Sequence, residues 1–272
     1  MTIAPGLCSI TLRSLPAEEV LEVAVRAGIE GIEWGADGHA PPGGGSDLTA
    51  LAARCRDAGV EVASYGSYLG FAAPGDDDLS TVNAVLDSAE ALGAPMVRIW
   101  TELGTTPDSA PDERVRVTDR TAALAEAIGA RGLTAALEFH PFTLTHTATS
   151  TNHLLDRLQR PNLRTHWQPD PTLPVETALG ELTKVASRLA HVHVFTWGQA
   201  GIDDRHALDD GAALWRSALA IAEFEGDPIS QRYALCEYVR DDDPEQLVAD
   251  VRTLRRWIEG IEESSDERTQ SL

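Results

Sequence analysis

Acidic, imidazole and amide side chains gather at the ends of four short β-rich runs in the second half of the chain. In chain order they are Glu138 and His140, then His166, Gln168 and Asp170, then His191 and His193, and finally Glu237. Two carboxylates, an imidazole and an amide or carboxylate oxygen form a hard, mostly oxygen donor set. Such a set suits Mn²⁺, Mg²⁺ or Co²⁺ better than the thiolate-rich sites that zinc often takes. The residues therefore predict a divalent-metal centre.

A metal centre of this kind needs a scaffold that brings the ends of neighbouring strands together. The β-rich runs cover residues 7–11, 29–34, 60–65, 96–101, 133–138, 163–167, 190–195 and 234–238. Segments with apolar residues at helical spacing alternate with them, including 47–58, 79–92, 114–130, 151–158, 175–187, 212–224 and 244–258. This alternation predicts an α/β fold, a single-domain (β/α)8 TIM barrel over 1–260, followed by an acidic, frayed tail over 261–272.

The active site of such a barrel lies at the C-terminal ends of the strands. Adjacent strands are about 4.8 Å apart, so side chains from four successive strands can reach one ion. A doubly wound open sheet is the alternative fold, and it usually needs a glycine-rich turn after the first strand. The glycine cluster at 41–45 follows the second run and does not match GxGxxG, which favours the barrel.

The composition excludes several classes of protein. With 22 basic and 43 acidic residues among 272, the net charge of −21 argues against binding to nucleic acid or to an anionic membrane. No apolar run approaches the roughly 18–20 residues of a membrane span, and no secretion signal is recognisable, so we expect a cytoplasmic protein. Cys8, Cys55 and Cys236 are too scattered for a disulfide framework, and we interpret Cys236 as buried filler.

The ordered motifs resemble the xylose-isomerase-like barrel superfamily, in particular its sugar and sugar-phosphate isomerases and epimerases. The matching pieces are LEFH at 137–140, HVHVF at 191–195, LCEY at 235–238 and the segment from Arg205 to Trp215. The resemblance extends to about residue 258. It implies one divalent ion, with Mn²⁺ expected first and Mg²⁺, Co²⁺ or Zn²⁺ as alternatives. Carried over residue by residue, the implied metal ligands are Glu138, Gln168, His193 and Glu237.

This sequence departs from the family pattern at the sixth strand, where the family's aspartate falls on Gln168. An amide oxygen can bind a hard cation but adds no negative charge, so we expect a lower metal affinity. Asp170 stands two residues later and stays an alternative ligand if the kink at 169–171 turns it inward. The metal centre therefore has one ligand position that the sequence leaves open.

The resemblance implies proton transfer next to the carbonyl of a sugar, ketose or keto-polyol. Glu138 and Glu237 would be the catalytic pair, one removing a proton and the other returning it, while the metal acts as a Lewis acid. Dehydration of an inosose-like keto-polyol stays open, as does a catalytically impaired barrel that only binds a polyol. Abasic-site DNA endonucleases share this barrel, but the charge of −21 disfavours that activity.

Residues at or beyond the strand ends are the candidates for substrate binding. They are Trp100, Trp167 and Trp197, together with His140 and Arg205. Flat aromatic faces can pack against the C–H surfaces of a sugar, although the same rings could simply cap the barrel core. The resemblance implies that Arg205 contacts a substrate hydroxyl or phosphate, and a surface ion pair with Asp203, Asp204 or Asp209 is the alternative. The expected partner is a small sugar or polyol, with no nucleic acid and no membrane, and a homodimer stays open.

Overall fold

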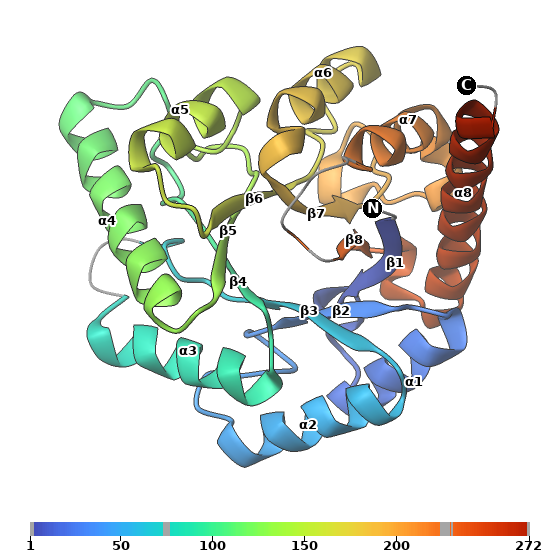
Figure 1. Ribbon diagram of the computed structural model, residues 1–272, viewed down its shortest axis with the longest axis horizontal. Helices are drawn as coiled ribbons and strands as arrows, with labels where there is room; N and C mark the ends of the chain where they lie inside the picture. The colour runs from blue at the N-terminus through green and yellow to red at the C-terminus, as the bar shows by residue number, and fades with distance from the viewer. Residues whose placement is uncertain (1–2, 73–76, 224–228, 230, 271–272) are drawn as a thin grey trace.

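Eight parallel strands close into a barrel that is surrounded by helices (Figure 1). This computed structural model describes residues 3–72, 77–223, 229 and 231–270, with the backbone alone for 262–270. The strands are β1 (Ile3–Cys8), β2 (Gly31–Gly35), β3 (Glu61–Gly66), β4 (Met96–Ile99), β5 (Thr134–Glu138), β6 (Leu163–Trp167), β7 (Leu189–Val194) and β8 (Arg232–Cys236). Each strand pairs with the next one along the chain, and β8 pairs with β1. The predicted (β/α)8 fold is confirmed.

The helices cover the outside of the barrel with their apolar faces turned inward. They are α1 (Ala17–Ala27), α2 (Gly45–Asp57), α3 (Leu79–Leu92), α4 (Pro111–Ala130), α5 (Ala148–Leu158), α6 (Val175–Val185), α7 (Ala212–Ala222) and α8 (Pro244–Gln270). None of the described helices is long and apolar enough to cross a membrane. The backbone of α8 is helical to Gln270, and fraying of 261–272 stays a prediction.

The first strand begins four residues before its predicted start at 7 and ends three residues before its predicted end at 11. Residues Ser9–Leu12 form a 3-10 helix instead, and β1 covers Ile3–Cys8. Pro5 and Gly6 weaken a strand signal in the sequence. In the closed barrel, however, a glycine fits best, because a Cβ at residue 6 would lie 2.6 Å from Cδ2 of Leu235 and 3.1 Å from Cβ of Tyr233 on β8. Closure of the barrel thus places Cys8 at the C-terminal end of β1.

Gly70, in the segment that follows β3, is a position where an alanine should be costly. Its φ is +85°, and a Cβ would overlap the backbone carbonyl oxygen of Trp100. We expect Gly70→Ala to lower the free energy of unfolding by about 1–3 kcal/mol, measured by urea denaturation. Gly180→Ala is the control, because nothing lies within 4 Å of a Cβ at this helical position. An unchanged Gly70→Ala midpoint would show that this close approach does not constrain the fold.

Candidate active site

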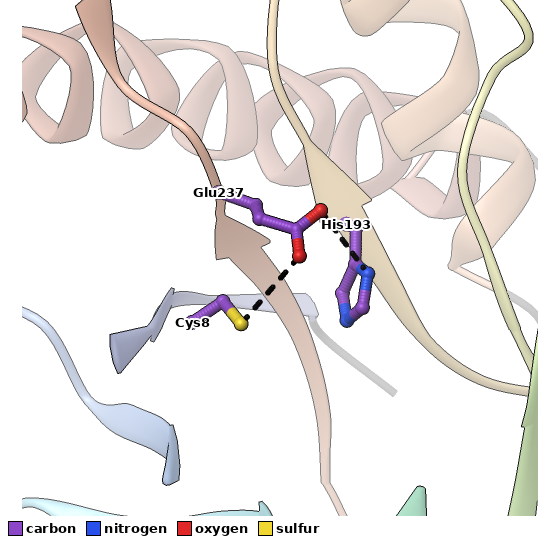
Figure 2. A group of neighbouring side chains, drawn as sticks. All are labelled: Cys8, His193 and Glu237. Atoms are coloured by element: carbon purple, nitrogen blue, oxygen red, sulfur yellow. Dashed lines mark hydrogen bonds and ion pairs between the residues drawn. The ribbon is translucent and has the colours of Figure 1, made fainter. Parts of the chain in front are cut away.

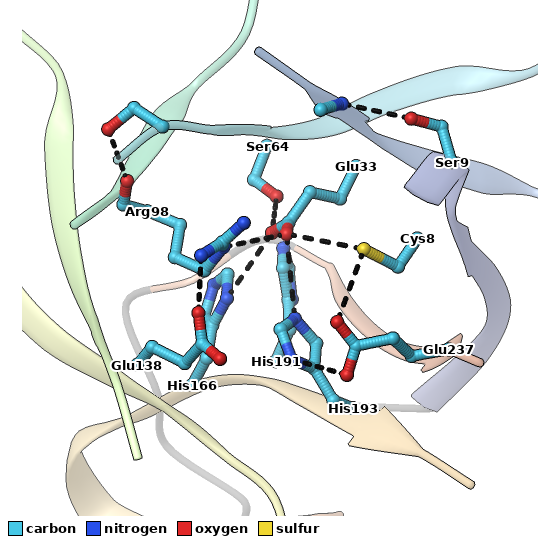
Figure 3. A network of polar contacts seen from close by, with 12 residues as sticks. Cys8, Ser9, Glu33, Ser64, Arg98, Glu138, His166, His191, His193 and Glu237 are labelled. Carbon is cyan, nitrogen blue, oxygen red and sulfur yellow. Dashed lines mark hydrogen bonds and ion pairs between the residues drawn. The ribbon is translucent and has the colours of Figure 1, made fainter. Parts of the chain in front are cut away.

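A buried polar network fills the barrel toward the C-terminal ends of the strands (Figure 3). Alternate residues of a strand point to the same face, so each strand can direct a side chain near its C-terminal end into the barrel. The network residues are Cys8 of β1, Glu33 of β2, Ser64 of β3, Arg98 of β4, Glu138 of β5, His166 of β6, His193 of β7 and Glu237 directly after β8. Every strand therefore contributes to one continuous polar centre.

The four residues expected to hold a metal form a chain of contacts across this centre. The Gln168 amide nitrogen donates to Oε1 of Glu138 at 3.4 Å. The Gln168 amide oxygen lies 3.2 Å from Nδ1 of His193. The same Nδ1 lies 3.4 Å from Oε2 of Glu237. The structure thus brings Glu138, Gln168, His193 and Glu237 together in the order of their strands.

Two other polar residues that the sequence singled out, Asp170 and His191, form hydrogen bonds outside this chain of contacts. Oδ1 of Asp170 accepts hydrogen bonds from the backbone N–H and the hydroxyl of Thr172, so Gln168 and not Asp170 contacts the predicted ligands. His191 lies deeper in the barrel, where its Nδ1 accepts a hydrogen bond from the backbone N–H of Tyr233. Burial lowers the pKa of His191 to about 3, which describes a neutral core histidine.

A buried arginine that the sequence analysis did not consider stands in the middle of the network. Nε of Arg98 donates to Oε1 of Glu33 at 2.9 Å, and Nη1 of Arg98 donates to Oε2 of Glu138. The Arg98 side chain is 4% exposed, and those of Glu33 and Glu138 are 0% and 6% exposed. A charged residue inside a short apolar run, as in GIEWG and MVRI, is the sequence signal that could have identified Glu33 and Arg98.

Glu33 lies at the centre of the network and contacts several side chains besides Arg98. Its carboxylate accepts a hydrogen bond from the hydroxyl of Ser64. Nδ1 of His166 lies 3.4 Å from Oε2 of Glu33, and Nε2 of His193 lies 3.6 Å from its Oε1. Burial by itself would raise the pKa of Glu33, but Arg98 and the two imidazoles hold it well below its ordinary value. Glu33 is therefore a fixed negative charge.

The described residues include two groups of three possible metal ligands whose donor atoms lie within 4.8 Å of one another. One group is Glu33, His166 and His193, and the other is Cys8, His193 and Glu237 (Figure 2). Both groups use His193, and both are buried. Nε2 of His193 has no hydrogen-bond partner among the described residues. The donor set of the network thus fits a divalent cation near His193.

The network also carries an excess of negative charge. Three carboxylates, those of Glu33, Glu138 and Glu237, face the single permanent cation Arg98. Burial raises the pKa of Glu237 to about 7, with Glu138 adding to the effect and His193 opposing it. Burial would lower the pKa of His193, but Glu237 and Glu33 raise it to about 9. A bound cation would balance this charge in place of protons.

The metal-free protein should lose stability as the pH rises from about 7 to about 9. The pKa of His193 is about 9 in the folded protein, against an ordinary value of 6.5 for a histidine exposed in the unfolded chain, so the stabilising proton on His193 is lost across this interval. Glu237, with a pKa of about 7, adds a loss of the same sign at the lower end. Urea denaturation in this interval should show a slope of up to about 1.4 kcal/mol per pH unit, flattened in His193→Gln. A midpoint that rises with pH would contradict the assignment.

Two of the predicted substrate-binding residues, Trp100 and His140, lie together beside the network. The Trp100 ring is stacked on that of Tyr68, with centroids 6.3 Å apart, and is 4.7 Å from the ring of His140. The Arg98 guanidinium lies 5.6 Å from the Trp100 ring. Trp100 and His140 are thus placed where a ligand of the polar centre could contact them.

The other predicted substrate-binding residues lie farther around the barrel. Trp197 is stacked on Phe195 at 4.0 Å. Arg205 lies over the Tyr238 ring and forms an ion pair with Asp242, which the sequence analysis had not named as a partner. Trp167 is buried in the hydrophobic core, and its ring centroid is 6.1 Å from that of Trp215. This packing favours the core-capping alternative for Trp167.

Comparison with known proteins agrees with the observed fold. The sequence model described as xylose isomerase-like TIM barrel matches residues 21–258. The solved structure of the probable 3-DHS dehydratase AsbF from Bacillus anthracis is 18% identical, with a TM-score of 0.74, and the alignment covers 93% of this chain and 99% of that one. A structure of L-ribulose 3-epimerase is 17% identical, with a TM-score of 0.73 and 97% of both chains covered.

A third similar structure is that of the IOLI protein with a binding zinc atom. It is 16% identical, with a TM-score of 0.68, and the alignment covers 96% of this chain and 98% of that one. Identities at this level show a shared fold only. A search among curated proteins gives no match. Since the family match covers most of its length, the chain belongs to the xylose isomerase-like TIM barrel family.

Proposed function

We propose that the protein is a metal-dependent isomerase or epimerase that moves a proton next to the carbonyl of a sugar, ketose or keto-polyol. One observation carries the proposal. Two buried carboxylates, Glu138 and Glu237, stand on opposite sides of a pair of metal-compatible donors, Gln168 and His193, in one chain of contacts. The proposal is supported by the family to which the chain belongs and by the similarity of its fold to that of an L-ribulose 3-epimerase.

The two carboxylates of the proposed acid–base pair have different surroundings. Arg98 and Gln168 both donate hydrogen bonds to Glu138 and hold its carboxylate in place beside the proposed metal ligands. The raised pKa of Glu237, about 7, suits a group that holds and returns a proton near neutral pH. A divalent cation bound by Glu138, Gln168, His193 and Glu237 would polarise the substrate carbonyl. Trp100 and His140 would hold the substrate beside these groups.

A second candidate, dehydration of a keto-polyol, uses the same acid–base pair. The structural neighbour described as a dehydratase is as similar to this chain as the epimerase is, with TM-scores of 0.74 and 0.73. Elimination of water begins with the same proton abstraction, so the carboxylates alone do not separate the two outcomes. The identity of the product does.

The test is a product analysis in D₂O with protein loaded in turn with Mn²⁺, Mg²⁺, Co²⁺ and Zn²⁺. A panel of ketoses and inososes is followed by NMR. Deuterium at the carbon next to the carbonyl, with an isomerised or epimerised product, supports the proposal. An unsaturated product lacking water would assign the dehydratase instead. Bound metal without deuterium incorporation into any substrate would leave a polyol-binding barrel and refute the enzymatic proposal.

A further inference from the structure

We propose that Cys8 is a metal ligand together with His193 and Glu237, and that its sulfur makes the site selective for Zn²⁺ over Mn²⁺ and Mg²⁺. The inference deepens the proposed function, since it rests on a metal centre that uses the same His193 and Glu237. In this inference the sulfur of Cys8 takes the place of the oxygens of Glu138 and Gln168, so the donor set has sulfur, nitrogen and oxygen atoms. Cys8 would bind as a thiolate, and its proton would leave to solvent when the ion enters.

The distances among the three side chains suit a tetrahedral ion (Figure 2). Sγ of Cys8 lies 3.7 Å from Oε1 of Glu237, and Nδ1 of His193 lies 3.4 Å from Oε2 of Glu237. Zinc–ligand bonds of about 2.0–2.3 Å separate neighbouring ligand atoms by about 3.3–3.8 Å in a tetrahedron. The Glu237 carboxylate therefore already lies at this spacing from the sulfur through one oxygen and from the imidazole through the other, and one ligand atom of each residue lies within 4.8 Å of the other two.

The fold fixes Cys8 in this position through barrel closure. β1 pairs with β8 in a register that places Leu7 beside Cys236. The next residue of each chain segment is Cys8, at the end of β1, and Glu237, directly after β8, so these two residues are neighbours. His193 comes from β7, the other neighbour of β8. The three ligands thus stand on consecutive strands of the closed sheet.

The buried polar atoms of this group are poorly satisfied by the protein alone. Nε2 of His193, on a fully buried side chain, has no hydrogen-bond partner among the described residues and lies 3.6 Å from Oε1 of Glu33. The thiol of Cys8 faces two carboxylates, with its sulfur 3.6 Å from Glu33 and 3.7 Å from Glu237. A thiol is a weak donor and compensates little for burying such charge. A cation bound by the sulfur, Nδ1 of His193 and Glu237 would give these carboxylates a positive partner that the thiol does not supply.

The opposite side of the network is less suited to the ion. Arg98 already binds Glu138, and the guanidinium would repel a cation placed there. Gln168 contributes an amide oxygen without charge. An ion held toward β1, β7 and β8 leaves the Glu138 carboxylate, which pairs with Arg98, available as the base.

The selectivity follows from the sulfur. Mg²⁺ prefers an octahedral set of oxygen ligands, whereas zinc takes thiolate, imidazole and carboxylate ligands alike. The sequence-based expectation of a hard, manganese-type site did not include Cys8. With Cys8 as a ligand, Zn²⁺ should bind more tightly than Mn²⁺ or Mg²⁺.

The test is the absorption spectrum of the full-length protein loaded with Co²⁺, which reports sulfur ligation independently of activity. We expect a thiolate-to-cobalt charge-transfer band in the near ultraviolet. Cys8→Ser and Cys8→Ala should lose the band and should lower zinc affinity at least about tenfold in chelator competition. Cys55→Ser is the matched control, since it removes a buried thiol far from this network, and it should keep both band and affinity.

The outcomes separate this inference from the proposed function. If Co²⁺ binds to the wild-type protein without a charge-transfer band, the ligands are oxygen and nitrogen only. Sulfur ligation is then refuted while the metal-dependent function stands. A band that survives in both Cys8 variants also refutes it. If no divalent ion binds, the metal-dependent function fails as well. The wild-type spectrum decides the question even if the Cys8 variants do not fold.

Discussion

Glu138→Gln is expected to slow the exchange of the substrate's α-hydrogen with solvent by about 10²–10⁴-fold, the usual contribution of a general base. The substitution preserves the shape of the side chain and removes the charge that accepts the proton. Arg98 keeps its hydrogen bond to Glu33, so the centre of the network retains one of its two ion pairs. The measurement is deuterium incorporation from D₂O, followed by NMR, in the best substrate of the panel.

The control for this experiment is Glu126→Gln. Glu126 is an exposed residue of α4 whose carboxylate pairs with Arg160 at the surface, and its loss should leave the exchange rate unchanged. Equal thermal midpoints for the variants would show that lost exchange does not reflect lost folding. Exchange at the wild-type rate in Glu138→Gln would remove Glu138 from the proton-transfer step.

Arg98→Met is expected to lower the free energy of unfolding of the metal-free protein by about 3–5 kcal/mol, the cost of breaking a buried ion pair by removing one partner. Methionine fills much of the same volume but leaves Glu33 and Glu138 without their shared cation. Two buried carboxylates would then face one another and Glu237 with no permanent positive charge among them. Urea denaturation at neutral pH measures the loss.

The pH dependence of the same measurement separates charge from packing. Without Arg98, the pKa of Glu33 should rise from its present low value, so acid should neutralise the uncompensated charge and reduce the deficit. A loss caused by packing alone would be the same at pH 5 and pH 8. Arg131→Met is the control, because Arg131 pairs with Asp87 and Glu90 at the surface and should contribute less than about 1 kcal/mol. A deficit for Arg98→Met no larger than that of this control would contradict the prediction.

Local patterns in the sequence were sufficient to predict the elements that build the barrel. The strand at 163–167 and the helix at 79–92 have the predicted bounds, because the period of apolar residues is a local property of the chain. The contacts among Glu138, Gln168, His193 and Glu237 also follow from the strand order, since β5 to β8 are neighbours in a barrel that runs in chain order.

The partners of the buried charges were decided by the tertiary structure alone. Arg98 meets Glu138 and Glu33 across 40 and 65 residues of chain, and Cys8 meets Glu237 only because β8 closes on β1. A sequence shows that a charged residue interrupts an apolar run, but the energy of burying that charge depends on which opposite charges the closed barrel places beside it. For this reason the sequence determined the scaffold and the strand-end residues, whereas barrel closure determined the ion pairs and the placement of Cys8 at the centre.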